Sequence, residues 1–192
     1  LDYALGGSAK DLDTGRAATE EYADAILDML KDNFEESTML LLAVSGGGGT
    51  GSGSAETMIK IMSSLGKPIV VLFVLPLSSE DALSKHNAIQ TLSQLAQMAK
   101  TDTINSLVVV DNAKVELLFP GMSMSEFWKA ANKAIVEPLH LFNKLSSAPS
   151  EYTSLDSMDF VKVLTTGDCS LYGMTTLEQY TEETAIAEAM IN

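Results

Sequence analysis

Residues 47–53 read GGGTGSG, and this stretch decides the fold. Six of the 13 glycines in the chain lie within residues 46–53. The apolar residues 39–44 precede this stretch, and Met58, Ile61, Met62 and Leu65 follow it at helical spacing. Glycine lets the backbone turn tightly and expose its N–H groups, while the positive end of a following helix attracts anions. We therefore predict a phosphate-binding loop over residues 45–54, between a strand and a helix, in preference to a flexible linker.

Outward from this loop, apolar runs alternate with helical periods. Apolar runs at residues 39–44, 69–75 and 105–110 predict strands, the first two buried on both faces. Helices are predicted at residues 80–99 and 123–145, with a shorter one ending at Phe119. Asp13 is predicted to cap an earlier helix whose apolar stripe is Tyr22, Ile26, Met29 and Leu30. A short strand at 160–164 and an acidic helix from residue 176 complete the chain.

This alternation predicts an α/β fold, with a doubly wound and mostly parallel sheet. Ligands of such sheets bind at the carboxyl ends of the strands. The loops after Val44, Leu75 and Val110 are therefore the predicted site. The polar segment 146–154, which contains Pro149, is the best candidate for a domain boundary.

Composition narrows the range of partners. The chain has 26 acidic against 12 basic residues and a net charge of −14, which would repel the phosphate backbone of nucleic acids. Its longest apolar run, residues 68–77, is shorter than the roughly 20 residues needed to cross a bilayer. The single cysteine, Cys169, is typical of a reducing compartment. We expect a cytoplasmic protein that binds neither nucleic acid directly nor a membrane.

Two common nucleotide loops fit poorly. Gly46, Gly48 and Gly51 match the dinucleotide spacing G-x-G-x-x-G, but the next predicted strand ends in Leu75 and Pro76, without the required acid. A Walker A loop needs Lys after its last glycine, whereas Ser52 follows Gly51. A dinucleotide-dependent oxidoreductase remains an alternative on the glycine spacing alone.

Residues 47–53 resemble the signature of the tubulin and FtsZ superfamily, letter for letter. That resemblance implies GTP or GDP as the cofactor, together with Mg²⁺. It also implies a Rossmann-like GTPase domain, a long core helix and the start of a second α+β activation domain. Residues 7–15 are similar to the loop that meets the γ-phosphate and its magnesium, and residues 76–80 to the ribose-side loop. The implied cofactor-binding residues are Gly7, Ser8, Ala9, Lys10, Gly47, Gly48, Gly49, Thr50, Gly51, Ser52, Glu80, Asn112, Trp128 and Asn132.

The last three of these residues would recognise the base. Asn112 follows the third strand, where its amide could read a base edge, although Asn is also a common turn former. Trp128 and Asn132 are four residues apart and share one helix face. In the superfamily an aromatic residue at this place stacks on guanine, whereas a lone Trp is more often part of a core.

Residues 154–159 read SLDSMD and resemble the superfamily loop N-L-D-x-x-D. By this resemblance Asp156 and Asp159 are the catalytic residues, which enter the nucleotide pocket of the next subunit and polarise the attacking water. Ser154 departs from the pattern, and an acid-capped entry to a strand is the plainer alternative. No metal ligand is assigned.

Residues 108–114, VVVDNAK, resemble the TubZ filaments that partition plasmid and phage DNA. The implied protein is a GTPase subunit that associates head-to-tail with itself. A DNA-binding partition adaptor would be recruited through a tail outside this sequence. A division protein like FtsZ, a phage spindle protein and a filament subunit without hydrolysis are alternatives. We expect residues 1–122 to be part of the GTP-binding domain and residues 123–148 to be the core helix. Residues 149–192 would be the catalytic loop and the start of the activation domain, and further strands would precede Leu1.

Overall fold

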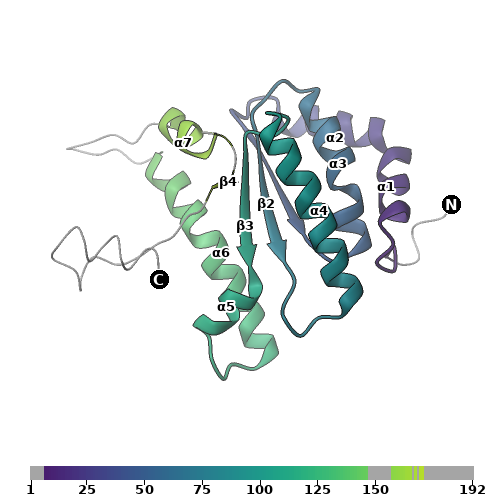
Figure 1. Ribbon diagram of the computed structural model, residues 1–192. Helices are drawn as coiled ribbons and strands as arrows, with labels where there is room; N and C mark the ends of the chain where they lie inside the picture. The colour runs from purple at the N-terminus through teal and green to yellow at the C-terminus, as the bar shows by residue number, and fades with distance from the viewer. Residues whose placement is uncertain (1–6, 147–156, 166, 168, 171–192) are drawn as a thin grey trace.

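A parallel sheet forms the centre of the computed structural model, which describes residues 7–146, 157–165, 167 and 169–170. Its strand order is β1 (Leu40–Ser45), β2 (Ile69–Leu75), β3 (Ser106–Asp111) and β4 (Cys169–Ser170), all running the same way (Figure 1). Ser45 pairs with Val74, and Val74 pairs with Val110. The three long strands therefore end at one common edge, and the predicted doubly wound α/β fold is confirmed.

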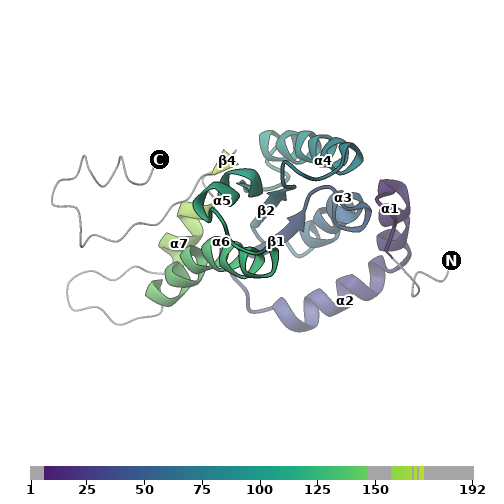
Figure 2. The same ribbon diagram turned by 90° about the horizontal axis from the view of Figure 1, so that it is seen from below.

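Helices cover both faces of this sheet. They are α1 (Leu12–Glu21), α2 (Ala23–Phe34), α3 (Gly49–Ser63), α4 (Ala82–Lys100), α5 (Asn112–Leu118), α6 (Met124–Ser146) and α7 (Ser157–Leu164). Helices α3 and α4 pack on one face, where Phe73 and Leu107 are fully buried. Helices α6 and α7 lie on the other face, where Val108, Ile135 and Leu164 belong to a second buried core (Figure 2). Among the described helices, none combines the length and the apolar character that a bilayer crossing demands.

Backbone packs on backbone where α1 crosses α3. A Cβ placed on Gly53 would lie 2.2 Å from the carbonyl oxygen of Leu12, and one on Gly15 would lie 2.2 Å from that of Gly49. Real side chains never come so close to backbone atoms. Glycine at these positions therefore allows the two helices to approach each other without intervening side chains.

Two expectations for the first half of the chain are wrong. The glycine stretch is not a loop throughout, because α3 already begins at Gly49. The helix expected from Asp13 is two helices, separated at Tyr22, and its cap is Asp11 rather than Asp13. An Asp11 oxygen accepts from the N–H of Asp13 at 2.9 Å, which places Asp13 inside the first turn.

The strand expected to be buried on both faces is buried on one. In β1, Leu40 and Val44 are buried, whereas Leu41 is 45% exposed. Within the described part of the sheet, β1 lies at an edge and its second face carries little cover. Strand β2, in the middle, is buried on both faces as predicted.

The strand expected at residues 160–164 is also wrong, because these residues belong to helix α7. Val161 and Leu164 are buried and three residues apart, while Val163 is 56% exposed. That burial follows the helical period, and the short apolar run could not distinguish it from a strand. The acidic helix expected from residue 176 and most of the boundary segment, residues 147–154, lie outside the described residues. The division into domains stays a prediction.

Candidate functional site

The glycine stretch leaves the end of β1 and enters α3, and its first two amide groups are bonded within the protein. The N–H of Gly46 donates to Val74 O at 2.7 Å, and that of Gly47 donates to Ser52 Oγ at 3.1 Å. Gly47 has φ of +100°, a left-handed conformation that favours glycine. No side chain caps the start of α3, so its first N–H groups lack the usual partner. Gly48 and Thr50 are exposed beside them. The arrangement suits an anion.

A second loop, residues 7–10, lies against the glycine stretch. The hydroxyl groups of Ser8 and Thr50 are 3.2 Å apart, within hydrogen-bond distance. Ala9 and Lys10 are both left-handed, with φ of 48° and 67°. The structure thus brings together two predicted ligand-binding segments that are about 40 residues apart in sequence.

Lys10 forms an ion pair with Asp81, which begins α4. Asp81 also accepts from the N–H and the hydroxyl of Ser84, at 3.0 and 3.1 Å. The Lys10 ammonium and these hydrogen bonds hold the pKa of the Asp81 carboxyl well below its usual range. In this structure the Lys10 charge is therefore neutralised within the protein, although the side chain stays partly exposed.

Glu80 closes the turn that follows β2. Its Oε1 accepts from the N–H of Leu77 at 3.1 Å, and its own N–H donates to Leu77 O at the same distance. The carboxylate is half-buried. The contact expected between Glu80 and the ribose stays a prediction.

Asn87, on the second turn of α4, was not predicted as a site residue. It is buried, and its amide donates to Lys10 O at 2.8 Å and to Gly47 O at 3.3 Å. The available signal was a polar residue at a position of α4 that faces the core. Its partners, 77 and 40 residues away, could not be read from the sequence.

The predicted base-reading residues follow β3. Asn112 is the first residue of α5; it is 6% exposed, and among the described residues nothing bonds its buried Oδ1. A buried amide oxygen without a partner is costly, so this atom is suited to accept from a ligand. Trp128 is not a core residue: it is 38% exposed and meets the buried Phe127 edge-to-face at 5.1 Å. Asn132, one turn further along α6, is exposed.

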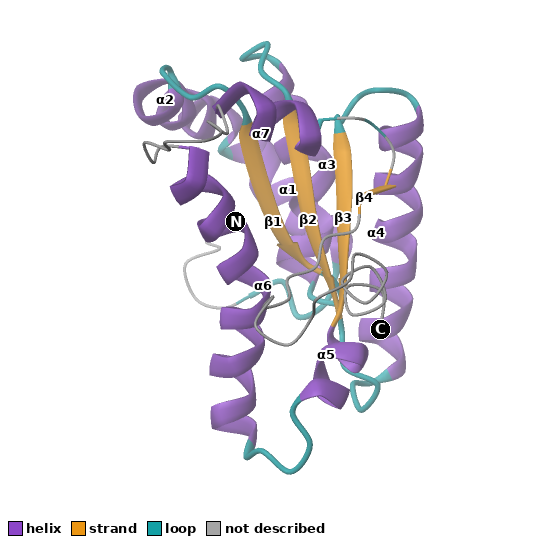
Figure 3. Ribbon diagram, turned by 90° about the vertical axis from the view of Figure 1, so that its left-hand side faces the viewer, coloured by secondary structure: helices purple, strands orange, loops and turns teal. Residues whose placement is uncertain are grey.

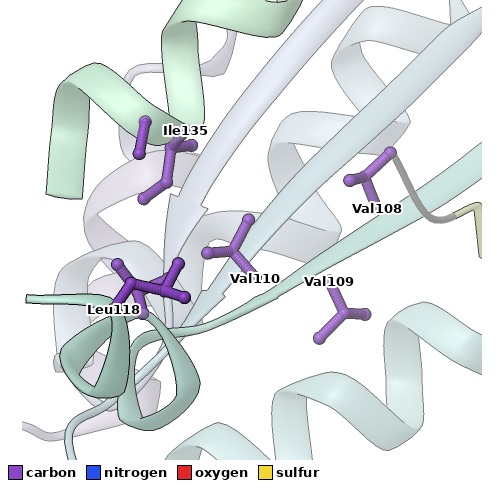
Figure 4. A pocket seen from close by; sticks show the side chains of 7 residues that line it. Val108, Val109, Val110, Leu118 and Ile135 are labelled. Carbon is purple, nitrogen blue, oxygen red and sulfur yellow. The ribbon is translucent and has the colours of Figure 1, made fainter. Parts of the chain in front are cut away.

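An apolar cavity of about 220 Å³ lies between the two helices that carry these residues. Val110 of β3, Leu118 of α5 and Ile135 of α6 face this cavity (Figure 4). Leu118 is 66% exposed, so the cavity is incompletely closed. The base end of the candidate site therefore contains unfilled apolar space.

Asp159, the predicted catalytic acid that the structure describes, is not next to this site. Asp156 lies outside the described residues, and Asp159 is half-buried in the first turn of α7. Helix α7 lies at the end of the sheet where the strands begin, opposite α5 (Figures 1 and 3). Within one chain the structure thus separates Asp159 from the glycine stretch. Over the described ranges, no three His, Cys, Asp or Glu side chains gather as a metal-binding group.

Known proteins match this arrangement. The model of the Tubulin/FtsZ family, GTPase domain, matches residues 7–118. The "Tubulin-like protein TubZ" of Bacillus cereus is 26% identical over 166 residues, which are 83% of this chain and 38% of that protein. The "Cell division protein FtsZ" of Neisseria gonorrhoeae is 29% identical over 174 residues, 90% of this chain and 42% of that protein. The chain therefore spans less than half the length of these relatives.

A solved structure agrees in fold. CetZ2 from Haloferax volcanii, in a GTPγS-bound protofilament, superposes with a TM-score of 0.77 at 27% identity, over 90% of this chain and 49% of that one. The matched family region contains loop 7–10, the glycine stretch, Asp81, Asn87 and Asn112. Because that match covers more than half of the 192 residues, the chain belongs to the tubulin/FtsZ family, over the GTPase domain of that family.

Proposed function

We propose that this chain is part of a GTP-binding and GTP-hydrolysing filament subunit that acts in plasmid or phage DNA segregation. The observation that carries the proposal is the pairing of two features at one edge of the sheet. These are the uncapped start of α3 and the buried, unbonded Oδ1 of Asn112. Strands β1 and β3 flank β2, so their ends are about 10 Å apart. A nucleotide with its phosphates on α3 and its base toward α5 fits that spacing.

Mg²⁺ fits the same end of the site. It prefers oxygen ligands and is commonly held by phosphate oxygens and water, with few protein groups. The exposed hydroxyl groups of Ser8 and Thr50 are oxygen donors beside the start of α3. When bound there, the ion would neutralise charge on the phosphates.

Self-association is part of the proposal, because Asp159 lies at the opposite end from the glycine stretch. A second subunit stacked head-to-tail would bring its α7 end to the nucleotide, and Asp156 and Asp159 would then orient the attacking water. The CetZ2 structure is a GTPγS-bound protofilament, which agrees with such stacking. A partition adaptor that binds DNA would link the filament to its cargo.

The decisive measurement is phosphate release from GTP against protein concentration, with the full-length polypeptide that carries this sequence. Specific activity should rise steeply above a threshold concentration, because each site is completed by a neighbour. Asp159→Ala should abolish release while GTP still binds. Asp28→Ala, which removes an exposed carboxylate from α2, is the matched control and should change neither property.

A mixing experiment tests the shared site directly. Asp159→Ala subunits retain a nucleotide pocket, and Asn112→Leu subunits retain the acids. At a GTP concentration that fills the unmodified pocket but not the Asn112→Leu pocket, a mixture should therefore recover hydrolysis that neither variant shows alone. Constant activity per subunit at all concentrations would contradict the proposal. A mixture that hydrolyses GTP no faster than either variant alone would contradict the assignment of Asp159.

Division is the second candidate role, because FtsZ of N. gonorrhoeae matches at 29% identity and TubZ of B. cereus at 26%. Deletion of the gene separates the two roles. Faster loss of a resident plasmid or phage at unchanged cell length would support segregation. Long, undivided cells would support division.

A further inference from the structure

Helix α4 carries a polar stripe on the side that it buries. Ser84, Asn87 and Thr91 are 1%, 3% and 1% exposed, at positions where an amphipathic helix normally places apolar residues. Burying an amide is unfavourable unless it is hydrogen-bonded. Asn87 meets this requirement by donating to backbone carbonyl groups of two other segments.

The two acceptors of Asn87 belong to the two loops of the candidate phosphate site. Its Nδ2 donates to Lys10 O at 2.8 Å and to Gly47 O at 3.3 Å. Both acceptor residues are left-handed, with φ of 67° and 100°. An amide nitrogen has two hydrogens, so one side chain can hold both carbonyl groups.

The bond to Gly47 O also fixes the direction of a donor. In a trans peptide the C=O and the next N–H point in opposite directions. Holding Gly47 O against α4 therefore turns the N–H of Gly48 away from α4. Gly48 precedes the uncapped first turn of α3 and is exposed.

We propose that Asn87 is the positioning residue of the phosphate site: it holds loop 7–10 at a fixed spacing from the glycine stretch and orients the Gly47–Gly48 peptide toward the terminal phosphate of a nucleoside triphosphate. The inference rests on the proposed function and deepens it. Asn87 itself touches no phosphate. It acts through Lys10 and Gly47.

The test compares the binding of GTPγS and GDP by calorimetry for the full-length polypeptide and its Asn87→Ala variant. Affinity for GTPγS should fall about 10-fold, the worth of one well-placed hydrogen bond, and affinity for GDP should fall less. Hydrogen exchange of residues 8–15 without nucleotide should become faster in the same variant. Asn87→Ser, too short to reach both carbonyl groups, gives the same test if the alanine variant does not fold.

The matched control is Asn105→Ala. Asn105 Oδ1 accepts from the N–H of Ile69 at 2.8 Å, where β2 begins, so its loss should lower the melting temperature without changing the GTPγS-to-GDP ratio. An unchanged ratio for Asn87→Ala, with or without faster exchange, would overturn the inference while the proposed function stood. Failure of the unmodified protein to bind either nucleotide would overturn both.

Discussion

The two ends of the candidate nucleotide site are built differently. At the phosphate end, Ser8 meets Thr50, Lys10 pairs with Asp81, and Asn87 bonds two loops. At the base end, Asn112 leaves a buried oxygen without a partner in the described structure, and Trp128 is 38% exposed. The phosphate end is thus largely formed before a ligand arrives. The base end has groups that only a ligand would satisfy. Substitutions at the two ends should therefore affect different properties.

At the phosphate end the largest expected effect is on folding. Gly53→Ala should lower the free energy of unfolding by about 3 kcal/mol, because its Cβ would lie 2.2 Å from Leu12 O and α1 would have to move away. Denaturant unfolding measures this change. Gly48→Ala is the control, since its Cβ meets nothing within 4 Å and should cost less than about 1 kcal/mol. Equal losses for both variants would mean that α1 and α3 are not in close contact.

At the base end the effect should fall on ligand binding. Asn112→Leu should weaken GTP binding about 10- to 100-fold and leave the stability of the ligand-free protein unchanged or higher, because a buried unbonded oxygen is removed. Calorimetry and thermal unfolding measure the two properties.

Thr91→Val provides the control for Asn112. It removes the other buried side-chain oxygen that lacks a bond among the described residues, on α4 rather than near the predicted base. The stability of the Thr91→Val variant should not fall either. Unlike Asn112→Leu, however, this variant should keep the GTP affinity of the unmodified protein. A destabilised Asn112→Leu variant with normal GTP affinity would give Asn112 a structural role instead.

Trp128→Ala should weaken GTP binding about 5- to 30-fold through lost stacking on the base. The substitution removes the edge-to-face contact with Phe127, so the free energy of unfolding should fall by no more than about 1.5 kcal/mol. Trp128 is the only tryptophan in the sequence, so its fluorescence reports its surroundings directly. GTP should quench it. Fluorescence that is unchanged at saturating GTP would contradict stacking.

The smallest expected effect is that of Asp81→Asn, because asparagine still caps α4 and only the charge opposite Lys10 is lost. A lowered pKa in the folded state stabilises the fold at pH values above the unfolded carboxyl pKa, about 3.9, and the benefit disappears as pH falls further. The melting temperature should thus differ slightly from the unmodified protein at pH 7. The difference should shrink below about pH 4 and in high salt. A difference that grows on acidification would contradict the pairing.

The sequence predicted the fold well where burial imposes a period. Strands β2 and β3 and helices α4 and α6 were located to within a few residues, because their apolar runs are long and clear. Helix α7 was missed because residues 160–164, four apolar residues and one lysine, fit either period. The start of α3 was missed because glycine disfavours helices locally, and here the close approach of α1 outweighs that preference.

The candidate site was predicted in part, for a related reason. The glycine stretch and Asn112 follow strands whose ends the sheet aligns, so their common edge could be anticipated. Asn87 lies on α4 and Asp81 caps its start, and the importance of both residues depends on contacts with a loop more than 70 residues earlier in the chain. Such contacts depend on tertiary structure and leave no local pattern.

The close packing of α1 on α3 has a consequence for motion. Few side chains separate the two backbones at Gly15, Gly49 and Gly53. The contact therefore cannot adjust through changes of side-chain rotamer. The two helices should move together as a rigid body. Loop 7–10 leads directly into α1, and the glycine stretch leads into α3. A displacement of either loop would therefore move both helices and, through them, the other loop.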